Sequence, residues 1–158
     1  SGGGGGKSKK KASKTYLMEV EFAEGTSSQN LSSCLESMRQ PFHYDKGFST
    51  RPALVSDCTS DVRSEDGKYF GFEKERSSPG TFWLSITISE GKNRQCRRLA
   101  KRAGFLVHRL IRVRLGPLSL GGDVPSGSAR SLCKEEVELL WKLVDPKKKE
   151  VPDVLPLE

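Results

Sequence analysis

EGKNRQCRRLAKRAGFLVHRLIRVRLGPLSLGG, residues 90–122, is the most strongly patterned part of the chain. Between Gly91 and Gly122 it contains nine lysines and arginines and no aspartate or glutamate. Its apolar residues first repeat with the period of a helix and then alternate with the period of a strand, an order that a solvated basic tail lacks. The segment therefore predicts a folded basic surface.

The first half of this segment predicts a helix from Arg94 to Ala103. Four small or apolar residues recur at the i, i+3, i+4 and i+7 positions of one helical face: Cys96, Leu99, Ala100 and Ala103. Four basic residues fall on the opposite face: Arg94, Arg98, Lys101 and Arg102. Arg97 lies at the border between the two faces, and Gly104 is placed to end the helix.

The second half predicts a strand over residues 107–115, with Arg112 and Arg114 together on one face. The apolar residues of the other face are Ile111, Val113 and Leu115. A helix and a strand that both carry cations can follow a phosphate backbone, although each cation alone is more often only solvated. The segment holds few aromatic residues, so we do not expect a base-stacking platform here.

Three more strands are predicted: Lys14–Phe22, a short one around Ala53–Val55, and Thr81–Ser89. Further helices are predicted over Gln29–Arg39, with Ser27 or Ser28 as N-cap, and over Lys134–Val144. Alternation in the long strands places two apolar sets inward: Tyr16, Met18, Val20 and Phe22, and Phe82, Leu84, Ile86 and Ile88. The same alternation places Leu17 and Trp83 outward. This order of elements predicts an α+β domain on a mixed, largely antiparallel sheet with flanking helices.

The composition favours one domain that binds a polyanion. The chain has 158 residues, a formal net charge of +7 and no apolar run long enough to span a membrane. Its four cysteines are far apart and it has two histidines, so we expect no metal site and reduced thiols in an intracellular protein, with Cys34 and Cys96 in the core.

Three segments read as peripheral to the domain at 14–144. Residues 1–13 predict a flexible Gly/Lys linker, residues 58–80 a long loop insertion, and residues 145–158 a Pro/Lys-rich tail. Because the chain begins with Ser, we expect it to be a fragment or a processed product.

Two residues are open to different interpretations from the pattern alone. A border position leaves the Arg97 guanidinium half-shielded, so it can orient a carboxylate by paired hydrogen bonds or form an ordinary surface salt bridge. Tyr16 lies on the apolar face of its strand beside Lys14, so it can be a core residue or stack on an extruded base.

Residues 90–122 closely resemble the C-terminal signature of the ribosomal-RNA pseudouridine synthases of the Rsu/Rlu type. Lys14-Thr15-Tyr16 resembles the Lys-x-Tyr strand of that family, residues 50–53 (TRPA) its turn, and residues 125–140 its closing turn and helix. The resemblance covers about residues 14–144. It implies a mixed sheet with flanking helices, an RNA cleft, and conversion of uridine in RNA to pseudouridine without metal or organic cofactor.

The resemblance also assigns roles. Tyr16 would pack against the uracil, Arg97 would pair with the catalytic Asp, and Ile111 and Val113 would line or support the site. The resemblance implies that the RNA is ribosomal. The residues expected to contact it are Lys14, Lys92, Arg94, Arg98, Lys101, Arg102, Arg112 and Arg114.

One departure from the family concerns the nucleophile. The Gly-Arg-Leu-Asp motif that carries the catalytic Asp does not occur in the sequence, so we expect the chain alone to be inactive and to need an N-terminal part of the same domain. A non-catalytic RNA-binding or ribosome-associated protein on the same fold is the alternative, and a basic protein–protein module is a third. The Lys-rich start, the insertion and the tail are closer to a mitochondrial or plastid version than to a compact bacterial enzyme.

Overall fold

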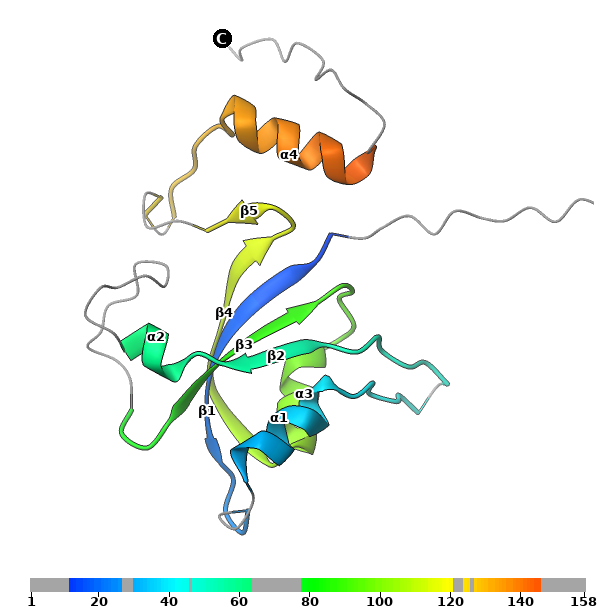
Figure 1. Ribbon diagram of the computed structural model, residues 1–158, viewed down its shortest axis with the longest axis vertical. Helices are drawn as coiled ribbons and strands as arrows, with labels where there is room; N and C mark the ends of the chain where they lie inside the picture. Colours follow the sequence, from blue (N-terminus) through cyan, green and yellow to red (C-terminus); the bar gives the residue numbers. More distant parts are fainter. Residues whose placement is uncertain are drawn as a thin grey trace, which may run out of the picture.

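The computed structural model describes residues 12–26, 30–45, 47–63, 78–120, 124–125 and 127–145. Most of the predicted linker, most of the predicted 58–80 insertion and all but the first residue of the predicted tail lie outside these ranges. Figure 1 shows the elements in chain order. They are β1 (Lys14–Phe22), α1 (Leu31–Arg39), β2 (Leu54–Asp57), α2 (Thr59–Arg63), β3 (Phe82–Ile88), α3 (Gln95–Arg102), β4 (Phe105–Leu115), β5 (Leu118–Ser119) and α4 (Lys134–Val144).

The strands form one sheet in the order β2-β3-β1-β4-β5, and each of the described pairings is antiparallel. β1 is the central strand and pairs with both β3 and β4 over most of its length. The predicted fold class, α+β on a largely antiparallel sheet with flanking helices, is therefore confirmed.

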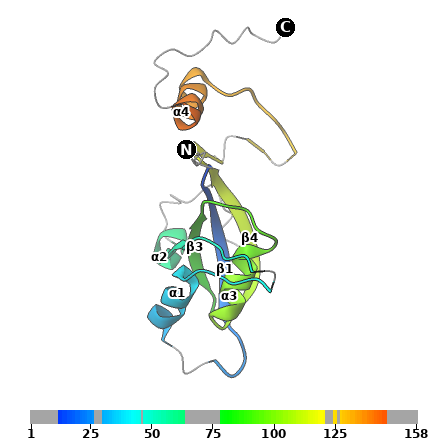
Figure 2. The same ribbon diagram turned by 90° about the vertical axis from the view of Figure 1, so that its right-hand side faces the viewer.

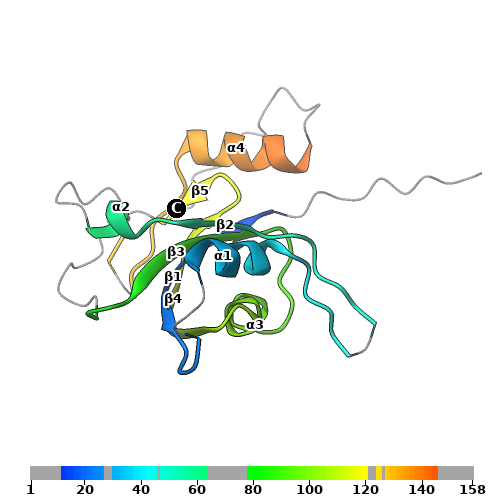
Figure 3. The same cartoon turned by 60° about the horizontal axis from the view of Figure 1, so that its bottom comes forward.

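The topology consists of two interleaved β-α-β units. β1-α1-β2 and β3-α3-β4 each join two parallel strands through a helix, and a strand of the other unit lies between the two. This is the split β-α-β arrangement of ferredoxin-like domains. Both crossover helices pack on the same side of the sheet, whereas α4 lies beyond β5 on the other side (Figure 3). Figure 2 shows α4 separated from α1 and α3 by the length of the sheet.

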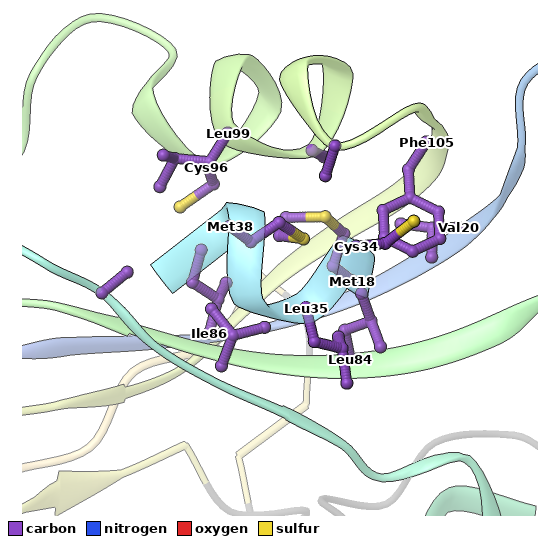
Figure 4. Close-up of a cluster of buried hydrophobic side chains, with 14 of the residues drawn as sticks. Met18, Val20, Cys34, Leu35, Met38, Leu84, Ile86, Cys96, Leu99 and Phe105 are labelled. Carbon is purple, nitrogen blue, oxygen red and sulfur yellow. The ribbon is translucent and has the colours of Figure 1, made fainter. Parts of the chain in front are cut away.

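The main core fills the space between the sheet and the two crossover helices (Figure 4). β1 contributes Met18 and Val20, which are fully buried, and α3 contributes Leu99 and Ala100, which are also fully buried. Met38 of α1 is fully buried in the same cluster. The faces predicted to be apolar on β1, β3, α1 and α3 are those that form this core.

The opposite face of the sheet is also covered, which the sequence did not predict. Leu17 and Trp83, expected to point into solvent, are 0% and 1% exposed and pack with Cys58 and Val113. The reason is that the chain folds back after β2 instead of leaving as a loop: the Cys58 N–H donates to the Trp83 carbonyl at 2.8 Å, and the Trp83 N–H donates to Thr59 Oγ1 at 2.8 Å. The short helix α2 follows within the predicted insertion.

Local hydrogen bonds fix the starts of α1 and α4. The predicted N-cap residues Ser27 and Ser28 lie outside the described residues. The N-cap of α1 is Asn30, whose side chain accepts from the Ser32 N–H at 2.9 Å. α4 has the predicted bounds, and the Cys133 N–H at its start donates to Glu136 at 2.9 Å. Arg130 binds both oxygens of Glu136, which lowers the pKa of that carboxyl to about 2.

Candidate nucleic-acid interface

Tyr16 lies on β1 between two cations. Across the sheet it pairs with Arg112 of β4 on one side and Ile86 of β3 on the other, and Lys14 lies two residues earlier on the same face. The ring is partly buried against the main core. A Cβ atom added to Gly91 would lie 2.8 Å from Lys14 Nζ, so the absence of a side chain at Gly91 makes room for this ammonium group.

A β-bulge separates two cations that were predicted to act together. The register of β4 against β1 shifts so that Arg112 pairs with Tyr16 but Arg114 pairs with Thr15. Tyr16 and Thr15 point to opposite faces, so Arg112 and Arg114 do not share a face as alternation alone predicted. Leu115 pairs with Lys14 and is 38% exposed, whereas Val113, predicted to lie on the same face, is buried.

The loop between β3 and α3 is fixed by a small polar network. Glu90 Oε1 accepts from the Arg51 N–H at 2.5 Å and from Gln95 Nε2 at 3.4 Å, and Gln95 Oε1 accepts from the Lys92 N–H at 3.3 Å. Gln95 is 2% exposed. The TRPA turn is thereby bound to the start of α3, and the backbone positions of Lys92 and Arg94 are set.

Arg94 has an unusual backbone conformation. It precedes α3 with φ 50° and ψ 29°, the left-handed region that non-glycine residues avoid. Such a conformation costs on the order of 1 kcal/mol and is found most often at binding and catalytic sites. The conformation leaves the Arg94 side chain exposed beside the N-terminus of α3.

The predicted division of α3 into two faces is confirmed. Its small and apolar residues are buried, Arg97 is half-buried at the border, and the four remaining cations are exposed. Arg97 donates to the Val107 carbonyl at 3.5 Å. Val107 pairs with Val20, four residues along β1 from Tyr16, so this carbonyl lies about 13 Å along the sheet from Tyr16.

Two of the exposed cations of α3 also make internal contacts. Arg102 donates to the carbonyls of Ser37, Gln40 (2.7 Å) and Pro41 (2.5 Å), where it satisfies carbonyls at the end of α1. The guanidinium of Arg98 lies 5.1 Å from the centre of the Tyr44 ring. Lys101 is exposed as well. RNA binding by these residues stays a prediction.

Sequence reasoning missed the aromatic residues beside these cations. Phe42, Tyr44 and Phe48 come from the segment between α1 and β2, and they contact Arg98, Arg102 and Lys92. The signal was present as FHYDKGF, residues 42–48, where aromatics flank a turn-forming Gly47. What the sequence does not show is that this turn lies against a helix about fifty residues later.

Arg109 has a structural role on the other face of the sheet. Its Nε donates to Glu19 Oε2 at 2.5 Å, and its guanidinium lies 4.8 Å from the centre of the Trp83 ring. Glu19 is 1% exposed and also accepts from the Ser78 N–H and the Thr81 hydroxyl, both at 2.9 Å. Burial raises the pKa of Glu19, but these hydrogen bonds, that from Arg109 above all, more than offset it and leave the pKa lowered.

The described part of the chain contains no group of three or more His, Cys, Asp or Glu residues placed to hold a metal ion. Its helices include none long and apolar enough to cross a bilayer. Among the acids, Asp57 is used to begin α2, since its Oδ1 accepts from the Thr59 N–H at 2.9 Å.

No protein-family model matches the chain. It is similar to the ribosomal large subunit pseudouridine synthase B of Escherichia coli (strain K12), with 35% identity over 96 residues, 59% of this chain and 33% of that protein. It is 34% identical to the ribosomal large subunit pseudouridine synthase E of Vibrio parahaemolyticus over 117 residues, 74% of this chain and 45% of that protein. An uncharacterized RNA pseudouridine synthase of Mycobacterium tuberculosis is 38% identical over 85 residues, 52% of this chain and 33% of that protein. The chain thus spans less than half the length of these relatives.

Proposed function

We propose that this chain, which belongs to the RNA pseudouridine synthases of the Rsu/Rlu type, is the part of such an enzyme that binds the target uridine and its flanking phosphates. The observation that carries the proposal is the similarity to three relatives that are all named as pseudouridine synthases. The structure supports it by placing the Lys-x-Tyr strand, the TRPA turn and the basic helix in one folded unit.

The reaction is an isomerisation. The bond from C1′ of the ribose to N1 of the uracil breaks, and a bond from C1′ to C5 forms. C5 loses a proton and N1 gains one, so the product has the composition of the substrate. The protein must therefore bind the freed base and the RNA backbone on either side of it. In the proposal, the partly buried ring of Tyr16 packs against the uracil, and Lys14 and Arg112 beside it bind phosphates.

Arg97 is proposed to orient the catalytic carboxylate, which would come from a part of the enzyme that this sequence does not include. Its hydrogen bond to the Val107 carbonyl is long, at 3.5 Å, so releasing it costs little. A carboxylate would replace that single contact with a paired, charge-assisted one, which is about twice as strong per bond.

The test uses a full-length synthase that contains this chain. We expect Arg97→Ala to reduce pseudouridine formation in ribosomal RNA strongly, as measured by carbodiimide mapping, while circular dichroism shows an unchanged fold. Lys142→Ala is the control, because Lys142 is an exposed cation of α4 and is not among the residues expected to contact RNA. Equal activity of the two variants would remove Arg97 from the site. Tyr16→Phe should keep more activity than Tyr16→Ala, since the ring is what contacts the base.

A non-catalytic RNA-binding protein on the same fold is the second candidate, since the exposed cations of α3 would serve RNA binding without any catalytic step. The two candidates differ in what the complete coding sequence contains: an upstream Gly-Arg-Leu-Asp supports the enzyme, and its absence supports the binding protein. Robust pseudouridine formation by this chain alone would contradict our expectation that the upstream Asp is essential.

A further inference from the structure

Residues 42–45 and 47–50 form a short hairpin, which we call the aromatic arm. His43 and Ser49 form a β-bridge, and the turn is closed by the Tyr44 N–H, which donates to the Phe48 carbonyl at 2.7 Å. Gly47 has φ 74°, which its lack of a side chain permits. In Figure 3 this segment projects from the body of the domain beyond the end of the sheet.

The arm is attached to the loop that begins α3. The Tyr44 hydroxyl donates to the Asn93 carbonyl at 3.1 Å, and the Tyr44 ring packs edge-on against Phe42 at 5.0 Å. Arg98 lies 5.1 Å from the centre of the Tyr44 ring. Tyr44 therefore holds the arm against the basic helix and is used by the fold itself.

Phe48 is not used by the fold in this way. It belongs to neither hydrophobic cluster of the described residues, and it is 59% exposed. Lys92 Nζ lies 5.3 Å from the centre of its ring, and the exposed Arg94 follows two residues later. An exposed phenylalanine beside exposed cations is an arrangement that single-stranded nucleic acid sites share.

We infer that Phe48 stacks on an unpaired base of the RNA while Lys92 and Arg94 bind the neighbouring phosphates. This inference rests on the proposed function, and it deepens it by naming single-stranded or looped RNA as the form that is bound. Residues 90–122 predict no stacking platform, because Phe48 lies outside that segment. A base inside a duplex has no free face, so stacking selects unpaired RNA, whereas cations alone bind both forms.

Charge favours RNA over a protein as the occupant. The cations around Phe48 are exposed, and the nearby Glu90 carboxylate is occupied by the Arg51 N–H and the Gln95 amide. An apolar protein partner would have to desolvate Lys92, which costs free energy without a matching carboxylate.

The test measures binding of this chain to a short fluorescein-labelled unstructured RNA and to a duplex of the same length, by anisotropy at fixed low salt. We expect Phe48→Ala to weaken binding of the single strand about fivefold or more, the range for loss of one base–aromatic stack, with little change for the duplex. Phe48→Trp should retain affinity, and the added tryptophan emission should be quenched by the single strand. Leu54→Ala is the control, because Leu54 is 74% exposed and lies outside the arm.

The outcomes separate this inference from the proposed function. If the unaltered chain binds RNA but Phe48→Ala and Leu54→Ala have the same affinities, the stacking role is wrong while the RNA-binding proposal stands. An equal loss for single strand and duplex also contradicts stacking. If the unaltered chain binds neither RNA, the proposed function fails and this inference fails with it. Thermal unfolding of each variant confirms that it is folded.

Discussion

Truncation of Arg109 is expected to destabilise the fold by about 3 kcal/mol at neutral pH. Arg109 is the cationic partner of Glu19, which is 1% exposed. Breaking a buried ion pair from one side costs about 3–5 kcal/mol, because the remaining charge is left without its partner.

Two features of this site adjust the figure. The Arg109 side chain is 28% exposed, and Glu19 keeps hydrogen bonds from Ser78 and Thr81, so the cost of breaking the pair falls just below that range, to about 2–2.5 kcal/mol. Loss of the cation over the Trp83 ring adds about 0.5–1 kcal/mol. The sum is about 3 kcal/mol.

The effect should depend on pH. The pKa of Glu19 is lower in the folded state than in the unfolded chain, so its ion pair contributes stability above the unfolded pKa and loses it as the pH falls through the folded pKa. Without Arg109, burial is less well offset and the folded pKa rises. The difference in unfolding free energy between Arg109→Ala and the unaltered chain should therefore be largest near pH 7 and shrink below about pH 4.

Urea unfolding followed by circular dichroism measures these differences. Arg112→Ala, an exposed cation three residues along β4, is the control and should change stability by at most about 0.5 kcal/mol. The double variant Glu19→Gln/Arg109→Ala should be more stable than Arg109→Ala, since it removes the unpaired charge. Equal costs for Arg109→Ala and Arg112→Ala, or the same cost at pH 3 as at pH 7, would refute the reasoning.

Three further results are expected. Gly91→Ala should change stability by under about 1 kcal/mol, because only the flexible end of the Lys14 side chain must move. The added methyl group displaces the Lys14 ammonium group, so RNA affinity measured by anisotropy should fall. Unchanged affinity would argue against RNA binding by Lys14. Cys133→Thr should stabilise α4 by about 0.5–1 kcal/mol, seen as slower amide exchange in that helix, because a hydroxyl is a better N-cap; faster exchange would contradict this. Iodoacetamide should label one thiol of the folded chain, that of Cys133, in intact-mass spectra, and labelling of more would show that the core opens. The thiols of Cys34, Cys58 and Cys96 are buried, and burial raises their pKa. The pKa rises to about 12 for Cys58 and to about 11 for Cys96.

Periodicity predicted the elements that pack against the main core because those elements are regular. The faces of α3 and the bounds of α4 follow from spacing alone, and both are confirmed. The errors arose where a second layer covers the sheet. Leu17 and Trp83 alternate correctly with their neighbours, but alternation cannot show that a later segment, Cys58 with α2, buries the outward face as well.

The surface was harder to predict than the core, because its contacts also join distant segments that share no periodic pattern. A β-bulge at Val113 separates Arg112 from Arg114, and no side-chain pattern marks where the extra residue enters the strand. The contact between Tyr44 and Asn93 joins residues far apart in sequence through one hydroxyl, which leaves no periodic signal. Contacts of this kind decide which cations are free to bind a ligand.

The central position of β1 has a consequence for synthesis on the ribosome. Among the described strands β1 is made before the others, but one of its two partners, β4, ends at Leu115, about ninety residues later. At about 5–20 residues per second, β1 waits roughly 5–20 s for that partner. During this interval its apolar residues Leu17, Met18 and Val20 have no finished sheet to enter. We therefore expect the nascent chain to be a client of chaperones that act at the tunnel exit, and slow codons between β1 and β4 should lengthen that dependence.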